Sequence, residues 1–358
     1  MRLEKVLKEM QKRQLTHLII NDPSSIDYLI NYKNNPGERM YLLLLSSDGH
    51  HKLFMNNLFY LDHELDIEQV WYSDTDNYLQ LLADEFDGAC SIGIDKNFPA
   101  SFLIPLMNLV DECHFELGSE CVDRVRMIKD EKEQQLMIEA SKINDLVVDE
   151  VINICAKGDL TEEEVSKQLE GIYQKHGCVG NSFEPIVAYG KNGADNHHSG
   201  DDSRLKVGDS IVIDIGGLYK GYCSDMTRTV FYKEVSPKQK TVYELVLKAQ
   251  KAAEAMIKPG VRLCDIDKCA RDIIAEGGYT VEFNHRLGHF IGRDVHEWCD
   301  VSQNFDLEVQ EGMTFSIEPG IYLQGEFGVR IEDLVLVTKD GCKILNSYPK
   351  DLRVIGND

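Results

Sequence analysis

Residues 208–230 read GDSIVIDIGGLYKGYCSDMTRTV, and residues 312–337 read GMTFSIEPGIYLQGEFGVRIEDLVLV. In each segment, an acid lies in an apolar run six positions after a glycine, and a second acid lies in the next apolar run. Apolar runs with a glycine-containing turn between them are typical of β-hairpins. Carboxylates in such runs face burial and need a compensating partner. The four acids are Asp214, Asp225, Glu318 and Glu332.

The spacing of the first hairpin predicts how its acids pair. If Tyr219 and Lys220 form the tip, Asp214 lies directly opposite Asp225. Directly opposed residues of antiparallel strands have Cβ atoms about 4.5–5.5 Å apart, so two like charges there repel each other. A cation between the two carboxylates would turn this repulsion into attraction.

The second hairpin repeats this arrangement, because Glu318 and Glu332 are symmetric about Gly325. Between the hairpins, residues 285–297 read HRLGHFIGRDVHE and contain three histidines, which are common metal ligands. Four carboxylates balance the charge of two divalent cations. Oxygen ligands with one nitrogen suit Mn, Co or Zn.

A purely structural role for the acids is the alternative. A single acid in a strand usually lies at an edge or pairs with an arginine, and Arg228 and Arg330 are available as partners. Two hairpins with the same internal spacing and a histidine-rich segment between them favour the metal site.

The motifs IDIG, SDMTRT, HRLGH, DVHE, SIEPGIY and VRIED together resemble the dinuclear metallopeptidases of the pita-bread fold. This family includes Xaa-Pro dipeptidase (prolidase), aminopeptidase P and methionine aminopeptidase. The resemblance covers residues 125–350, and the preceding third resembles the creatinase-type domain of prolidases. It implies two divalent metal ions, most often Mn²⁺, with Co²⁺ or Zn²⁺ as alternatives. The implied ligands are Asp214, Asp225, His289, Glu318 and Glu332.

The resemblance also implies catalytic roles. Glu318 would be both a metal ligand and the general base that carries a proton. His197 matches the family's catalytic histidine, although the family commonly has Leu-Pro before it and this chain has Asp195-Asn196. His198 follows directly, so the sequence leaves open which histidine of the pair acts. An adjacent pair in a polar loop is otherwise exposed and without function.

Other matches imply contacts to the substrate. His296 would contact substrate near the metals, and His285 would lie on the substrate side. Arg330 would orient ligands and substrate, since a guanidinium suits carboxylate recognition. Tyr322 is a further substrate-binding candidate, or else only a packed aromatic residue.

Arg293 stands where the family usually has an apolar residue. It either pairs with Asp294 or Asp300 at the surface or points into the cleft. In the second case, its charge would favour Asp-Pro and Glu-Pro over Leu-Pro, and an Arg293→Leu variant would lose that preference.

Composition limits the class of partner. The net charge of −23 argues against nucleic acid and anionic membranes as partners. No apolar run approaches the roughly 20 residues of a membrane span, and the N-terminal segment lacks a signal-peptide core. We therefore expect a cytoplasmic protein whose ten cysteines are reduced.

The element pattern predicts two domains, residues 1–125 and 126–358. The first has short apolar runs between helical segments, which predicts an α/β layer. The second combines helices with antiparallel hairpins, which predicts an α+β fold, and the shared hairpin spacing indicates an internal pseudo-two-fold. We expect helices over 3–14, 161–176, 237–257 and 263–276, and one that Asp130 and Glu133 cap at its start.

The resemblance implies cleavage of Xaa-Pro bonds in small peptides. A first domain of this length favours a prolidase acting on dipeptides over aminopeptidase P acting on longer peptides. A catalytically inactive binding protein on the same fold is a further alternative, which the complete ligand set disfavours. The resemblance also implies a homodimer, in which residues 32–40 (YKNNPGERM) of one subunit cap the cleft of the other.

Overall fold

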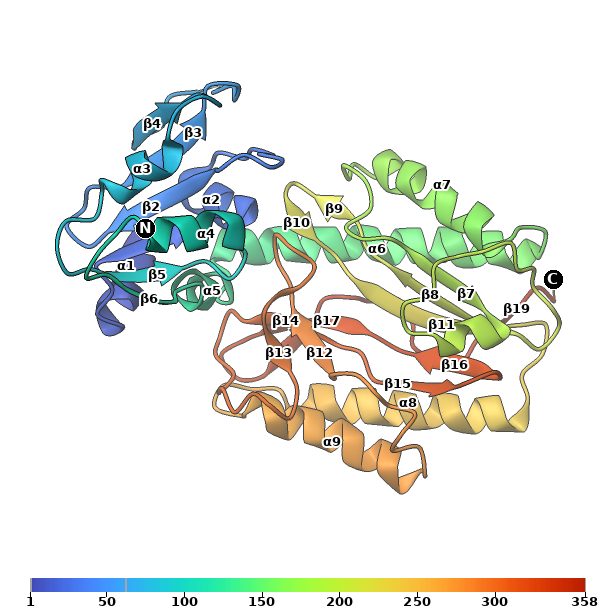
Figure 1. Cartoon of the computed structure of the whole chain (residues 1–358). Coiled ribbons are helices and arrows are strands. Elements are labelled where there is room, and N and C mark those ends of the chain that lie inside the picture. The colour runs from blue at the N-terminus through green and yellow to red at the C-terminus, as the bar shows by residue number, and fades with distance from the viewer. Residues whose placement is uncertain (1, 62, 358) are drawn as a thin grey trace. The chain divides into compact units, whose positions relative to one another are not determined.

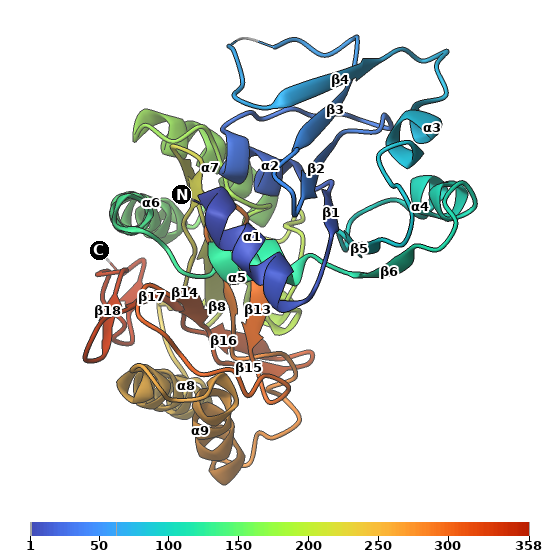
Figure 2. The same ribbon diagram turned by 90° about the vertical axis from the view of Figure 1, so that its left-hand side faces the viewer.

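The computed structural model describes residues 2–61 and 63–357. The chain divides into two compact units between Arg126 and Met127, whereas we expected the boundary after residue 125. Figures 1 and 2 show the N-terminal unit in blue to teal and the C-terminal unit in green to red.

The N-terminal unit contains a six-stranded mixed sheet in the order β4-β3-β2-β1-β5-β6. Its strands are β1 (His17–Ile20), β2 (Leu42–Ser46), β3 (Lys52–Asn56), β4 (Glu68–Tyr72), β5 (Ser91–Ile94) and β6 (His114–Leu117). Its helices are α1 (Arg2–Lys12), α2 (Pro23–Ile30), α3 (Tyr78–Ala83), α4 (Ala100–Met107) and α5 (Glu120–Arg126).

Both faces of this sheet are buried, which explains the unbroken apolar run of β2. Leu43 and Leu45 belong to the core cluster that includes residues of α1, α2 and α5. Leu42 and Leu44, which point to the opposite face, belong to the cluster that includes residues of α3 and α4. A sheet with helices on both faces is the α/β layer that the sequence predicted.

In its described residues, the C-terminal unit contains four long helices and two main sheets, which are antiparallel except for the parallel pair β11–β19. The helices are α6 (Glu131–Lys157), α7 (Glu162–Lys175), α8 (Pro237–Met256) and α9 (Leu263–Glu276), with a short 3₁₀ helix η1 (Gly190–Ala194). The strands are β7 (Ile186–Tyr189), β8 (Ser210–Ile215), β9 (Leu218–Tyr219), β10 (Tyr222–Cys223), β11 (Met226–Tyr232), β12 (Gly288–Phe290), β13 (Glu297–Val301), β14 (Thr314–Ile317), β15 (Gly320–Leu323), β16 (Phe327–Arg330), β17 (Asp333–Val337), β18 (Cys342–Ile344) and β19 (Val354–Ile355).

The same order of elements occurs twice in this unit. The helix pair α6–α7 is followed by the antiparallel strands β7, β8 and β11, and the pair α8–α9 is followed by β12, β14 and β17. In Figure 1, α6 and α7 lie on one side of the strands and α8 and α9 on the other. This duplication supports the pseudo-two-fold that the hairpin spacing indicated, and the pairing is antiparallel, as an α+β fold requires.

The predicted helix starts are confirmed by their caps. Asp130 accepts from the backbone of Glu133, and the Glu133 side chain accepts from the backbone of Asp130. Thr161 and Glu164 form the same reciprocal pair at the start of α7. Such capping boxes satisfy backbone donors that the first helical turn leaves unpaired.

The predicted pairing of the first hairpin is wrong. Asp214 lies opposite Thr227 rather than opposite Asp225. The two-residue turn consists of Lys220 and Gly221, with φ values of 48° and 82°, and not of Tyr219 and Lys220. A two-residue turn with positive φ at both positions matches the twist of the flanking strands, and glycine adopts it without strain. Asp225 is therefore diagonal to Asp214.

The predicted register of the second hairpin is confirmed. Gly320 pairs with Arg330 in the outer ladder and Ile317 with Asp333 in the inner ladder, so both ladders are centred on Gly325. Glu318 and Glu332 lie at the break between these ladders, where their side chains are not fixed by strand pairing.

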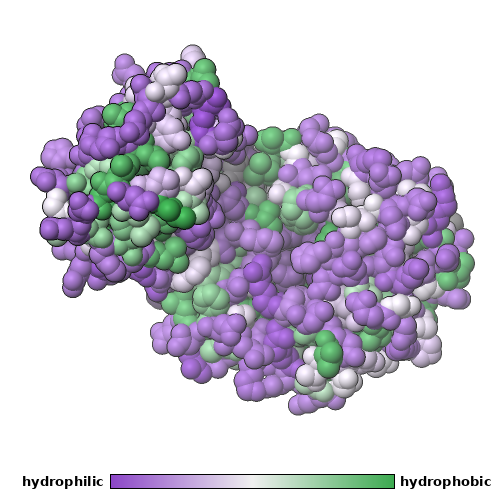
Figure 3. All heavy atoms as spheres, in the orientation of Figure 1, coloured by the Kyte–Doolittle hydropathy of each residue, from purple (hydrophilic) through white to green (hydrophobic). Residues whose placement is uncertain are grey.

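The face of the C-terminal unit seen in Figure 3 is mostly hydrophilic, in keeping with the net charge of −23. In the described part of the chain, no helix has the length and apolar character that crossing a membrane requires.

Candidate metal centre and active site

A cavity of about 590 Å³ in the C-terminal unit collects the candidate residues. The hairpins β8–β11 and β14–β17 contribute the acids, and β12 with its following loop contributes histidines. All candidates except Arg293 line this cavity: Asp214, Asp225, Glu318, Glu332, His197, His285, His289, His296, Tyr322 and Arg330.

The centre of the cavity has the spacing of a metal site. Asp225, His289 and Glu332 each present a ligand atom within 4.8 Å of the others. His289 Nε2 lies 3.5 Å from Asp225 Oδ2 and 3.5 Å from Glu318 Oε1. His289 Nδ1 lies 3.2 Å from the Phe290 carbonyl, which can only accept, so Nδ1 carries the proton. In the neutral imidazole, Nε2 is then the nitrogen without a proton, and it points to the acids, as in a metal-ligating histidine.

Three carboxylate oxygens of this cluster test whether a metal fits. Asp214 Oδ1, Asp225 Oδ1 and Glu332 Oε1 are buried and receive no hydrogen bond. A buried acceptor without a donor destabilises the folded state by about 1–3 kcal/mol. Divalent cations would satisfy all three oxygens and neutralise the acids. These residues therefore fit the two divalent ions that the sequence predicted.

Without a cation, burial raises the pKa values of three of these acids, Asp225, Glu318 and Glu332. Burial, and secondly the charge of Asp214, raises the pKa of Asp225 well above its usual range. Burial and the charge of Asp225 do the same to the pKa of Glu332. Burial raises the pKa of Glu318 to about 7, against the opposing effect of His289. A metal ion would have to displace protons from this cluster.

Arg330 is the organising cation of the cavity. Its Nη2 lies 2.6 Å from Asp214 Oδ2, its Nη1 donates to Tyr322 Oη at 2.9 Å, and its Nε donates to Thr227 Oγ1 at 3.1 Å. Thr227 Oγ1 in turn donates to Glu332 Oε2 at 2.7 Å. This chain of hydrogen bonds connects an acid of the first hairpin to an acid of the second.

The arginine alternative accounts for part of this arrangement. Arg330 pairs with Asp214, but Arg228 pairs with Asp333, which is not a candidate ligand. In the described part of the chain, neither the Asp225 carboxylate nor the Glu332 carboxylate accepts a hydrogen bond from an arginine. Arginines therefore do not replace the cation.

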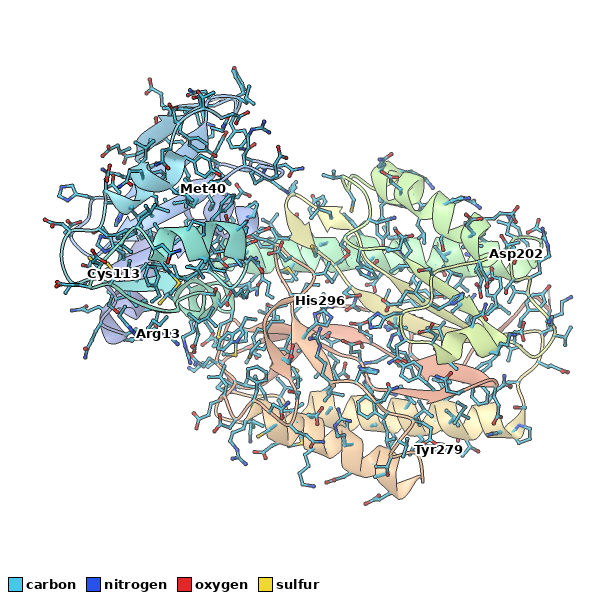
Figure 4. All side chains as sticks on the ribbon, viewed as in Figure 1. Arg13, Met40, Cys113, Asp202, Tyr279 and His296 are labelled. Atoms are coloured by element: carbon cyan, nitrogen blue, oxygen red, sulfur yellow. The ribbon has the colours of Figure 1, made fainter. Side chains whose placement is uncertain are left out.

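Two further histidines of the cavity are held neutral. Burial, and secondly the charge of Arg330, lowers the pKa of His285 to about 3, and His285 Nε2 lies 3.0 Å from Tyr322 Oη. Burial lowers the pKa of His296 to about 4, and its ring centroid is 4.4 Å from that of His289. His296, labelled in Figure 4, lies in the loop between β12 and β13.

The structure separates the two adjacent histidines. His197 is exposed and lines the cavity. His198 points instead to the buried Glu162, with Nε2 2.6 Å from Oε2. His197 is therefore the member of the pair that can reach a substrate.

Arg293 lies outside the lining of the cavity. Its guanidinium is 5.7 Å from the centroid of the Tyr222 ring, and its backbone N–H donates to Glu297. This position does not support the second alternative from the sequence, in which Arg293 points into the cleft. Asp300, one of the partners expected for Arg293, pairs with Arg286 at 2.8 Å.

Sequence reasoning missed three residues of this region. Arg286 lines the cavity, and its position inside HRLGH, next to His285, was the available signal. Thr227 bonds to Glu332 and Arg330, and only the correct hairpin register places it opposite Asp214. For Glu162, the sequence offered only its place in the first turn of a predicted helix, which does not indicate contacts with the segment around His197.

Both units of the chain match known protein families. Residues 135–339 match the model of metallopeptidase family M24, and residues 2–128 match that of the creatinase/prolidase N-terminal domain. The chain is 35% identical to a putative dipeptidase of Bacillus subtilis over 99% of each chain. It is 34% identical to an Xaa-Pro dipeptidase of Pyrococcus horikoshii over 98% of each chain.

The fold also matches that of a solved structure over almost the whole chain. The crystal structure of a prolidase from Thermococcus sibiricus superimposes with a TM-score of 0.93 at 32% identity, and the alignment covers 99% of this chain and 98% of that chain. Together with the buried cluster of acids around His289, these matches show that the chain belongs to metallopeptidase family M24 and carries a creatinase/prolidase N-terminal domain.

Proposed function

We propose that this protein is a two-metal peptidase that hydrolyses the Xaa-Pro bond of dipeptides. The observation that carries the proposal is the set of buried carboxylate oxygens that receive no hydrogen bond, grouped around His289 in one cavity. The relatives named Xaa-Pro dipeptidase and prolidase support the substrate.

The ions would be held by Asp214, Asp225, His289, Glu318 and Glu332. When bound, two divalent ions polarise the scissile carbonyl and lower the pKa of the attacking water. Glu318 would accept a proton from that water and pass it to the departing nitrogen.

His197 and His296, which both line the cavity, would donate hydrogen bonds to the reacting peptide group. Arg330 and Tyr322 would hold Asp214 and His285 in place.

The cations of the cavity support a dipeptide substrate. All three guanidinium nitrogens of Arg330 donate to protein groups. Among the described residues, Arg286 donates through Nη1 alone, to Asp300 at 2.8 Å, and the two side chains are 34% and 33% exposed. A dipeptide presents its own carboxylate one residue after the scissile bond, where a longer peptide has a neutral amide. Arg286 is therefore available to bind that carboxylate, because guanidinium and carboxylate groups are complementary.

A peptide-length comparison tests this function. The enzyme would be stripped of metal with a chelator, restored with Mn²⁺, Co²⁺ or Zn²⁺, and assayed on Ala-Pro and Ala-Pro-Ala. We expect metal-dependent cleavage of Ala-Pro that exceeds cleavage of the tripeptide. Preference for the tripeptide would indicate an aminopeptidase P, and no cleavage of either with any metal would indicate a non-catalytic binding protein.

The native metal, the oligomeric state and the location in the cell are further predictions. Mn²⁺ as the native metal is tested by the metal series, and a homodimer by light scattering of the metal-loaded protein. A cytoplasmic location is tested by fractionation of the source cells.

A further inference from the structure

Glu162, outside the cavity lining, is a buried carboxylate surrounded by donors. It is the first residue of α7, and its side chain is 0% exposed. Oε1 accepts from the backbone N–H of Tyr189 at 2.6 Å and from Asn192 Nδ2 at 3.0 Å. Oε2 accepts from the backbone N–H of Asp201 at 3.1 Å and lies 2.6 Å from His198 Nε2. Asn192 also lies 3.2 Å from Oε2.

All of these donors belong to the segment that carries His197. Tyr189 and Asn192 precede His197, whereas His198 and Asp201 follow it. The following stretch runs beside the first turn of α7, where Glu163 N donates to the Asp201 carbonyl, and Figure 4 labels the next residue, Asp202. Glu162 therefore fixes the backbone on both sides of a histidine that lines the cavity.

The chemistry of this position requires a carboxylate. A carboxylate accepts hydrogen bonds with both oxygens, whereas a glutamine amide has one oxygen and one NH₂ donor. In a Glu162→Gln variant, the NH₂ group would face either the donors around Oε1 or those around Oε2. Buried donors would then lose their acceptor, at about 1–3 kcal/mol each.

Glu162, His198 and Asp201 also have ligand atoms within 4.8 Å of one another. Both oxygens of Glu162 already accept hydrogen bonds, unlike the unsatisfied oxygens of Asp225 and Glu332. This cluster is therefore complete without a cation.

We propose that Glu162 and His198 form a positioning pair that holds residues 189–201 and thereby sets the place of His197 in the cavity. Neither residue touches the substrate. The catalytic effect rests on the proposed function, in which His197 contacts the reacting peptide group, whereas the hold on the loop does not.

Hydrogen–deuterium exchange tests the hold on the loop without any substrate. The metal-loaded Glu162→Gln variant is compared with Glu163→Gln, a matched change at the next residue, which is exposed and pairs with Lys167. We expect exchange of residues 189–201 to be at least about tenfold faster in Glu162→Gln and unchanged in Glu163→Gln. Equal exchange in both variants would overturn the proposal.

A double-mutant cycle tests the catalytic consequence. We expect Glu162→Gln to lower kcat for Ala-Pro about tenfold through displacement of His197, with KM changed less. In a His197→Ala background, the same substitution should change kcat less than about twofold, because its target is gone. Equal losses of kcat in both backgrounds would show a merely structural effect and overturn the proposal.

His198 provides an independent pair of variants should Glu162→Gln fold poorly. His198→Gln keeps an N–H donor for Glu162 and should retain kcat within about threefold, whereas His198→Ala should lose about tenfold. Equal activity of the two variants would contradict the pairing. If the wild-type enzyme cleaves no Xaa-Pro dipeptide, the proposed function fails, and the exchange experiment still decides whether Glu162 holds the loop.

Discussion

Arg330 and Asp214 form a buried ion pair in which only one carboxylate oxygen takes part. Arg330 Nη2 lies 2.6 Å from Asp214 Oδ2, while Asp214 Oδ1 is buried and receives no hydrogen bond. The arginine therefore orients the carboxylate and leaves its second oxygen available to a cation. One side chain can in this way both pair with an arginine and act as a metal ligand.

Replacing this arginine should destabilise the metal-free protein. Arg330→Met leaves Asp214 without its counterion among three other acids, and breaking a buried pair in this way lowers the free energy of unfolding by about 3–5 kcal/mol. Urea unfolding of the metal-free variant measures the loss. The control is Arg286→Met, whose partly exposed pair with Asp300 should contribute less than about 1 kcal/mol. Equal losses in the two variants would contradict the central place of Arg330.

Metal binding should stabilise the wild-type protein, and Asp225→Asn should remove that effect. A ligand at a hundred times its dissociation constant adds about 2.7 kcal/mol to the stability of the folded state. Without metal, Asp225→Asn should unfold at a higher temperature than wild type near neutral pH, because burial and Asp214 raise the pKa of Asp225 and the folded wild-type protein must bind a proton there, whereas asparagine is neutral without one. Thermal unfolding with and without Mn²⁺ measures both effects, and Asp202→Asn, at an exposed position, is the control. A metal-dependent rise that persists in Asp225→Asn would contradict the ligand assignment.

The buried His285 should make the protein sensitive to acid. Its pKa is lowered from 6.5 to about 3 by burial and by Arg330. The unfolded chain therefore binds one more proton than the folded protein between these values, and stability falls as the pH drops below 6.5. Between pH 6.5 and 5 the loss from this group is at most about 2 kcal/mol. Unfolding of wild type and His285→Gln at both pH values tests this. The same pH dependence in the two proteins would refute the assignment.

Arg286 should discriminate between a free carboxylate and an amide. We expect Arg286→Met to raise KM for Ala-Pro by roughly tenfold or more, since a charged hydrogen bond contributes about 1.5–3 kcal/mol. KM for Ala-Pro amide should hardly change, because that substrate has no carboxylate to lose. Steady-state kinetics with both substrates on both proteins gives the result. A similar rise in KM for both substrates would place the carboxylate elsewhere.

Much of the fold could be predicted because its signals are local. Asp130 and Thr161 mark helix starts through hydrogen bonds to residues three positions away. The second hairpin could be centred on Gly325 because a single glycine with positive φ, here 78°, lies between two apolar runs. The short helices α2 and α3 and the edge strands β4 and β6 were not predicted, since each is at most eight residues long and partly exposed.

The parts of the site that were missed depend on contacts between distant segments. Thr227 reaches Glu332 across 105 positions of sequence, and Arg286 reaches the cavity through the fold of its loop. The bonds of Glu162 to residues 27–39 positions away follow no periodicity. The first hairpin was misread because Gly216, Gly217 and Gly221 offer several turn positions, and only packing selects Lys220-Gly221.

The two-residue turn at Lys220-Gly221 restricts how this segment can vary in length. Side chains alternate between the two faces of a strand, so a length change that shifts the pairing of β8 and β11 by one residue would reverse which face of β11 meets the cavity. Thr227 would then turn away from Glu332. Substitutions in the turn change only its conformational preference. In homologous chains, we therefore expect glycine to be kept at position 221, where φ is 82°, and length changes to be confined to those that preserve the register of β8 and β11.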